Sequence, residues 1–237
     1  MFHTLFFQPL YNALVALSSV MPGGDIGLAI IALTILVKVL LFPLFQKAAE
    51  TQMAIKKVEP EMARIKEQYK NDQETQTKKI LELYRTNKIN PFSSILVLFI
   101  QIPIILALFW VFQGDFHFNA NELYSFVTLP DVLSTKLLGF IDITSRSLIL
   151  AILAGLTQYW QTALTLPAPE PKKGTPSFKD DFARSMNMNM RFFMPVMIGF
   201  FAWTLSSAIA IYWITGNLFA VGQEFYIRKK RARAGKS

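Results

Sequence analysis

Residues 26–45 read IGLAIIALTILVKVLLFPLF and decide the fold class of this 237-residue chain. A helix of about 20 residues rises about 30 Å, which matches the hydrocarbon core of a bilayer. Only Thr34, Lys38 and Pro43 interrupt the apolar run. The stretch therefore predicts a first transmembrane helix over residues 26–45.

Three further apolar segments follow along the chain, over residues 91–112, 147–166 and 192–226. Asn90 and Pro91 suit an N-cap and a first helical residue for the earliest of them. The last segment holds 35 residues and would extend about 52 Å as one helix, which is too long for one span. We expect it to break near Ser206-Ser207 into two spans. The prediction is an all-α polytopic membrane protein with five transmembrane helices.

The distribution of Lys and Arg predicts the orientation of these spans. Residues 46–90 carry ten basic residues, residues 167–191 carry five, and residues 227–237 carry six. Residues 113–146 carry only Lys136 and Arg146 against four acids, and residues 1–25 carry no Lys or Arg. Basic residues near span ends favour the cytoplasmic side. We therefore expect the N-terminus outside and the C-terminus in the cytoplasm, in a bacterial plasma membrane.

The segments between the spans have their own expected roles. Residues 1–25 predict a helix in the outer interface, with a spanning or removed segment as the alternatives. Residues 46–90 predict a cytoplasmic helical hairpin in which Pro60 begins a new helix. This hairpin is either a solvated connector or a surface that contacts a partner. The Pro-rich residues 167–191 predict a flexible cytoplasmic loop, and residues 113–146 an extracytoplasmic loop.

Composition excludes several classes of function. The chain is 52% hydrophobic and 17% charged, and it has two histidines and no cysteine. It offers no nucleophile–His–acid set, no metal-ligand spacing and no phosphate-binding loop. We therefore expect neither an enzyme nor a cofactor or metal site.

Lys38 is the most informative polar residue of the predicted spans. It follows Ile26 by 12 residues, which places it about 18 Å into the helix. A charge at the bilayer centre costs about 2.5–3.5 kcal/mol on insertion scales. Either Lys38 extends its ammonium to the interface, or it faces a water-filled cavity lined by protein. Thr34, one turn earlier on the same face, extends a polar strip.

Uncharged polar residues lie in the other spans. They include Gln101, Thr157, Gln158, Asn217 and Gln223. Each alone is typical of hydrogen bonding between membrane helices. Together they indicate a polar interior that opens on one side.

Several motifs, taken in order, resemble the YidC/Oxa/Alb family of membrane-protein insertases. The resemblance covers residues 27–230. The motifs are GLAIIALTILVK (27–38), FPL (42–44), VEPE (58–61), NP (90–91), QIPI (101–104), LAGLTQY (153–159), MPVM (194–197), YW (212–213) and NLF (217–219). Any one of these motifs is weak, whereas all of them in this order and at similar spacing are specific.

The resemblance implies a five-helix core around a hydrophilic groove that opens to cytoplasm and lipid. Lys38 matches the groove cation, although bacterial members usually have Arg there. Lysine keeps the charge but lacks the planar guanidinium fork. Thr34 and Trp213 match positions that face the substrate, and Gln101 and Gln158 are candidate lining residues.

The resemblance also implies partners. These are nascent membrane proteins and, through the basic tail and the hairpin, the Sec translocon, signal-recognition machinery and ribosome. The tail Arg228–Lys236 either anchors on anionic lipid or docks on ribosomal RNA. The alternative function is a subunit of a small-solute transporter or channel, which would need a continuous polar path. The apolar residues 26–33 argue against such a path.

Overall fold

The structure is a computed structural model that describes residues 1–90, 92–113, 116, 118–165 and 178–234. The described residues are mostly helical, with one short two-stranded hairpin, so the all-α prediction is confirmed at this level. The longer helices are α2 (Ile26–Leu40), α3 (Phe42–Gln68), α4 (Gln73–Thr86), α5 (Phe92–Gln113), α6 (Leu148–Thr165), α7 (Phe178–Thr204) and α8 (Ser207–Ala234). The shorter elements are η1 (His3–Phe7), α1 (Gln8–Val20), η2 (Pro22–Gly24), η3 (Ala120–Glu122), β1 (Lys136–Leu137) and β2 (Ile141–Asp142).

The chain forms two compact units, which we describe separately. The larger unit contains Met1–Lys38 and Leu106–Ser237, and the smaller unit contains Val39–Ile105. Helices α2 and α5 each contribute residues to both units.

The smaller unit is built on the helical pair α3 and α4. The side-chain amide of Gln76 donates to the carbonyls of Lys66 and Tyr69, at 3.0 and 3.2 Å. Helix α3 continues through Pro60, so the expected new helix at this residue was wrong. Pro60 is exposed, as is Lys56 four residues earlier. Water can therefore solvate the carbonyl that loses its helical partner at the proline.

The first predicted span also differs from the structure. Helix α2 ends at Leu40, and α3 begins at Phe42 with Pro43 in its first turn. Proline lacks an amide hydrogen and its ring clashes with the carbonyl four residues back, so it suits a helix start. Pro43 accounts for the break within residues 26–45.

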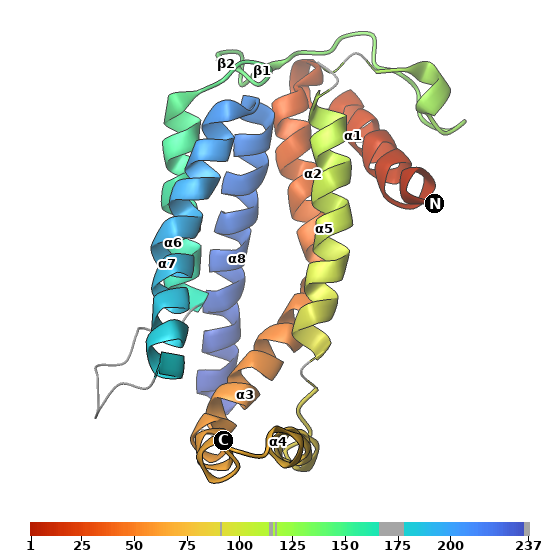
Figure 1. Cartoon of the computed structure of the whole chain (residues 1–237). Helices are drawn as coiled ribbons and strands as arrows, with labels where there is room; N and C mark the ends of the chain where they lie inside the picture. Colours follow the sequence, from red (N-terminus) through yellow and green to blue (C-terminus); the bar gives the residue numbers. More distant parts are fainter. Residues whose placement is uncertain (91, 114–115, 117, 166–177, 235–237) are drawn as a thin grey trace. The chain divides into compact units, whose positions relative to one another are not determined.

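Helices α6, α7 and α8 pack side by side in the larger unit (Figure 1). Helix α7 ends at Thr204 and α8 begins at Ser207, where the sequence predicted a break. Residues from Phe178 onward are helical, although we expected a loop over residues 167–191. Residues 166–177, which include the Pro-rich part of that loop, lie outside the described residues.

The segment that joins α5 to α6 binds the middle of α1 and the starts of α2 and α8. Asn12 of α1 donates to the carbonyl of Glu122 at 2.9 Å and accepts from the amide of Tyr124 at 2.7 Å. The carbonyl of Ser145 accepts from the amide of Ser207 at 2.8 Å, at the start of α8. Free amides at a helix N-terminus need such acceptors.

Asp25 holds the same segment against the start of α2. Its carboxylate accepts from the amide of Leu28 at 3.0 Å, as an N-cap does, and from the amide of Leu138 at 2.7 Å. Ser134 and Gly24 complete the junction, because the amide of Ser134 donates to the carbonyl of Gly24 at 2.9 Å.

The described helices include apolar lengths suited to a bilayer. Helix α6 is by itself long and apolar enough to cross a membrane, and α2 with α3 meets the same test as a broken pair. Shorter apolar stretches cover Phe99–Phe112 in α5 and Arg191–Thr204 in α7.

Substitution of two adjacent glycines tests the packing of the junction before α2. Gly23 and Gly24 both have positive φ, at 64° and 66°. A Cβ on Gly24 would overlap the carbonyl oxygen of Val132, whereas a Cβ on Gly23 would meet nothing within 4 Å. We expect Gly23→Ala to cost about 1–2 kcal/mol for the left-handed backbone alone, and Gly24→Ala to cost more. Thermal unfolding in detergent measures both, and equal midpoints would contradict the close contact.

Candidate functional site

Lys38 lies near the end of α2, and its side chain packs along α8. A Cβ built on Gly216 would lie 3.4 Å from Cε of Lys38. Gly216 is buried and Lys38 is half-buried. The glycine therefore leaves room for the aliphatic stem of the lysine beside the backbone of α8.

Thr34 stands one turn before Lys38 on α2. It is buried, and its hydroxyl donates to the carbonyl of Ile30 at 2.7 Å. Because the hydroxyl hydrogen is used within the helix, the oxygen presents only acceptor capacity to its surroundings. Thr34 and Lys38 together give α2 one polar face.

Helix α8 joins α6 through a hydrogen bond beside Gly216. The side-chain amide of Asn217 donates to the hydroxyl of Thr157 at 3.3 Å. Thr157 in turn donates to the carbonyl of Leu153 at 2.8 Å. The interpretation of these residues as contacts between helices is confirmed for Asn217 and Thr157.

Gln158 belongs to a polar network on α6. Its amide donates to Gln161 and to Thr162, at 3.1 Å each, and Gln161 donates to Thr165 at 3.0 Å. These bonds run along the helix toward its C-terminal end. The network makes this part of α6 polar, and the described contacts of Gln158 lie within α6.

The two remaining predicted site residues, Trp213 and Gln101, belong to different units. Trp213 is half-buried on α8, one turn before Gly216, so it shares the face of α8 that approaches Lys38. Gln101 is half-buried on α5, in the smaller unit. The larger unit thus contains Thr34, Lys38 and Trp213, and it places Lys38 beside Gly216 of α8.

Arg228 is a second tie between α8 and α6 that the sequence did not reveal. Its guanidinium donates to the carbonyl of Leu164 in the last turn of α6, and to the carboxylate of Glu224 at 2.8 Å. Carbonyls in the last turn of a helix lack helical partners and attract cations. The spacing Glu224–Arg228 predicts an ion pair within one helix, but the bond to α6 needs the fold.

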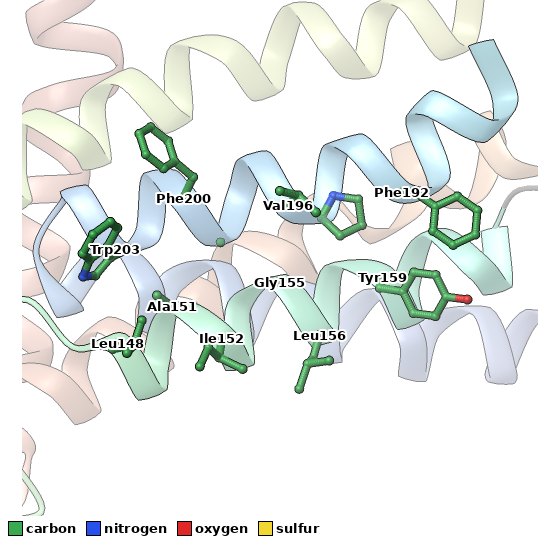
Figure 2. Close-up of a pocket in the computed structure, with 12 residues that line it drawn as sticks. Leu148, Ala151, Ile152, Gly155, Leu156, Tyr159, Phe192, Val196, Phe200 and Trp203 are labelled. Atoms are coloured by element: carbon green, nitrogen blue, oxygen red, sulfur yellow. The ribbon is translucent and has the colours of Figure 1, made fainter. Parts of the chain in front are cut away.

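An apolar groove of about 520 Å³ lies between α6 and α7 (Figure 2). Its lining includes Leu148, Ile152, Tyr159, Phe192, Phe200 and Trp203. The helices approach closely at its floor, where a Cβ on Gly155 would lie 3.1 Å from the carbonyl of Pro195 and 3.7 Å from Cα of Gly199. Small residues four apart on each helix, Ala151 with Gly155 and Pro195 with Gly199, permit this approach.

Fold and polar residues together define a helical membrane protein whose spans carry a lysine and hydrogen-bonding side chains on adjoining helices. The model of the family described as 60Kd inner membrane protein matches residues 17–234. The chain belongs to this family.

Curated relatives agree with this assignment. A protein of Clostridium tetani named membrane protein insertase YidC is 33% identical over 208 residues, which cover 88% of this chain and 84% of the relative. One of Clostridium perfringens with the same name is 32% identical, with 97% and 91% covered. One of Hahella chejuensis is 28% identical, with 98% of this chain but only 36% of the relative covered. The relatives are named as insertases, and the family is not one of enzymes.

The close approach of α6 and α7 gives a direct test. We expect Gly155→Leu to force the helices apart and to lower stability by about 1–3 kcal/mol, as overpacking does. Gly222→Leu is the matched control, because Gly222 is exposed on α8 and a Cβ there meets nothing within 4 Å. Thermal unfolding of both variants in detergent measures the difference. Equal stability of the two variants would contradict the packing at Gly155.

Proposed function

We propose that this chain inserts membrane proteins through a hydrophilic groove in which Lys38 is the cation. The function is inferred from membership of a family whose relatives are named as insertases. The groove is inferred from the residues around Lys38. In this proposal Thr34 and Trp213 flank the lysine, and Gln158 adds polar lining. Gln101 belongs to the smaller unit, and its lining role stays a prediction from the sequence. The observation that carries the site is the contact of the Lys38 stem with Gly216.

The lysine has a clear electrostatic role in this proposal. An ammonium near the cytoplasmic end of α2 attracts acidic or polar segments of an incoming chain, and low-dielectric walls strengthen the attraction. The stem against Gly216 limits the directions that the ammonium can take. A client segment would therefore meet the charge beside α8.

The polar side chains would lower the barrier for the client in a second way. A polar segment that crosses pure hydrocarbon loses its hydrogen bonds to water, at a cost of several kcal/mol per unsatisfied group. The amide and hydroxyl groups of Thr157, Gln158, Gln161 and Asn217 lie on α6 and α8. Such groups offer replacement partners and shorten the purely apolar distance.

The proposed topology uses α2, α5, α6, α7 and α8 as the five spans. The N-terminus lies outside, and α3 with α4 forms the cytoplasmic hairpin. Exposed ion pairs on α4 support a solvated hairpin, because Lys78 contacts Glu74 at 2.6 Å and Lys79 contacts Glu82 at 2.8 Å. Basic residues of α8 from Arg228 onward then face the cytoplasm, where anionic lipid attracts them.

Partners follow from the function and the topology. Nascent membrane proteins are the clients of an insertase. The Sec translocon, the signal-recognition machinery and the ribosome are proposed partners of the cytoplasmic hairpin and the basic end of α8. Association that depends on phosphate charge weakens steeply with salt, so a salt titration of ribosome binding tests the electrostatic part.

Complementation tests the proposal directly. We expect this chain to restore growth of bacteria depleted of their own insertase, and Lys38→Arg to do so as well because it keeps the charge. Lys38→Glu is expected to fail, since it would repel acidic client segments, and Lys38→Ala should rescue only in part. Arg146→Glu, an exposed position between β2 and α6 and outside the proposed partner surfaces, is the matched charge-reversal control.

The outcomes separate the two claims. A well-expressed wild-type chain that rescues nothing would contradict the insertase function in that host. Equal rescue by all Lys38 variants would leave the function standing and overturn the role of the lysine. Membrane levels of each variant, measured by immunoblotting, exclude loss of the protein as the cause.

A further inference from the structure

The β1–β2 hairpin presents two large apolar side chains at its tip. Lys136 pairs with Asp142 and Leu137 with Ile141, so residues 138–140 form the turn. Leu138 is 61% exposed and Phe140 is 72% exposed. A water-soluble turn of this length would normally use polar residues or glycine.

The turn is held firmly in this conformation. Leu138 has φ 53°, a left-handed value that is rare for a bulky residue. Its amide donates to the carboxylate of Asp25 at 2.7 Å, and the amide of Gly139 donates to the carbonyl of Lys136 at 3.1 Å. Leu137, directly before the turn, is buried. The structure therefore fixes the exposed side chains in place.

The hairpin lies where the helices of the larger unit begin and end (Figure 1). Asp25, which holds its tip, directly precedes the first residue of α2. The carbonyl of Ile143, just after β2, accepts from the amide of Ala208 in the first turn of α8 at 2.9 Å. In the proposed topology this end of the helices meets the outer surface of the membrane.

Apolar side chains are also exposed on α6 and α7 at the end of the larger unit where the hairpin lies. Leu148 and Ile149 at the start of α6 are 60% and 73% exposed, and Trp203 near the end of α7 is half exposed. Tryptophan is typical of the membrane–water interface. The tip and these residues lie at the same end of the larger unit, so exposed apolar side chains gather at that end.

Charge is confined to the base of the hairpin. Residues 137–141 read LLGFI and carry no ionisable group. Asp142 accepts from the hydroxyl and the amide of Thr144, and these hydrogen bonds, the hydroxyl's foremost, lower the pKa of its carboxyl. Asp142 is thus ionised at neutral pH, opposite the cation Lys136. A charged base below an uncharged apolar tip suits a hairpin that enters lipid only at its tip.

We propose that Leu138 and Phe140 insert into the outer leaflet of the membrane and anchor the β1–β2 hairpin there. The position at the helix ends, the exposed apolar side chains of α6 and α7 at the same end and the confinement of charge to the base favour phospholipid over a protein partner. This inference rests on the proposed topology but not on the role of Lys38. The hairpin would hold the outer loop against the start of α2 while clients enter from the opposite side.

Single cysteines test the insertion, because the chain has no cysteine of its own. Leu138→Cys and Phe140→Cys are labelled with an environment-sensitive fluorophore, and Asn121→Cys, an exposed polar position in the same loop, is the control. The labelled chains are reconstituted in vesicles of phosphatidylethanolamine and phosphatidylglycerol. We expect blue-shifted emission at positions 138 and 140 and quenching by lipids brominated about 5–10 Å below the surface. Position 121 should be quenched by aqueous iodide instead.

Two results would overturn the proposal. Iodide quenching at positions 138 and 140 equal to that at 121 would place the tip in water. Protection from both iodide and brominated lipid would show that protein covers it. Labelling of Asn121→Cys with a membrane-impermeant reagent in intact cells tests the topology separately. Labelling from the cytoplasmic side alone would refute the outer location, whereas lipid quenching would still show that the tip inserts.

Discussion

The aliphatic stem of Lys38 packs against Gly216, and the rest of the proposed site depends on this contact between α2 and α8. A charged residue in an apolar helix costs a few kcal/mol in a bilayer unless protein or water surrounds it. A larger residue at position 216 would occupy the space of the lysine stem. Because Asn217 follows Gly216 and bonds to Thr157, the same turn of α8 also fixes α6. One turn thus joins three helices around a cation.

The two ends of the larger unit are bound in different ways. At the end where α2 and α8 begin, backbone carbonyls of the α5–α6 segment accept from the first amides of α8, and Asp25 caps α2. Toward the other end of α8, the guanidinium of Arg228 donates to the carbonyl of Leu164 on α6. Backbone bonds at a helix start are rigid, whereas a long side chain can change its conformation readily. Backbone groups therefore hold the start of α8, whereas the bond of Arg228 to α6 depends on a side chain.

Much of the helical architecture could be predicted from the sequence, because apolar length and the distribution of charge act along the chain itself. The break at Ser206-Ser207 follows from the length of the apolar block, and α7 and α8 meet there. The predictions made at two prolines were wrong in opposite ways. Pro43 begins a helix inside a predicted span, whereas Pro60 lies inside a helix. The effect of a proline depends on whether water can solvate the carbonyl that it leaves unbonded, and the sequence alone does not show that.

Contacts between helices were less accessible to prediction. The polar character of Lys38, Thr34 and Asn217 was evident, yet the partner of each depends on which helix lies opposite. Gly155 and Gly216 act through the backbone surface that they leave uncovered, which neighbouring segments approach. Because glycine has no side chain, the sequence does not reveal these contacts. The hydrogen bonds of Gln158 to Gln161 and Thr162 run along its own helix, and its role as a lining residue stays a prediction. The tip residues Leu138 and Phe140 lie in a loop whose hairpin needs Asp25, which is 113 residues away from Leu138.

Solvent access at position 38 tests the central claim most directly. Single cysteines at Lys38 and at Leu36, whose side chain is exposed on α2 but apolar, are treated with a membrane-impermeant maleimide in inverted membrane vesicles. If Lys38 faces a hydrophilic groove open to the cytoplasm, Lys38→Cys reacts readily and Leu36→Cys, which lipid surrounds, does not. Equal protection of both cysteines would show that position 38 lies in lipid or in a closed core, and would contradict the groove.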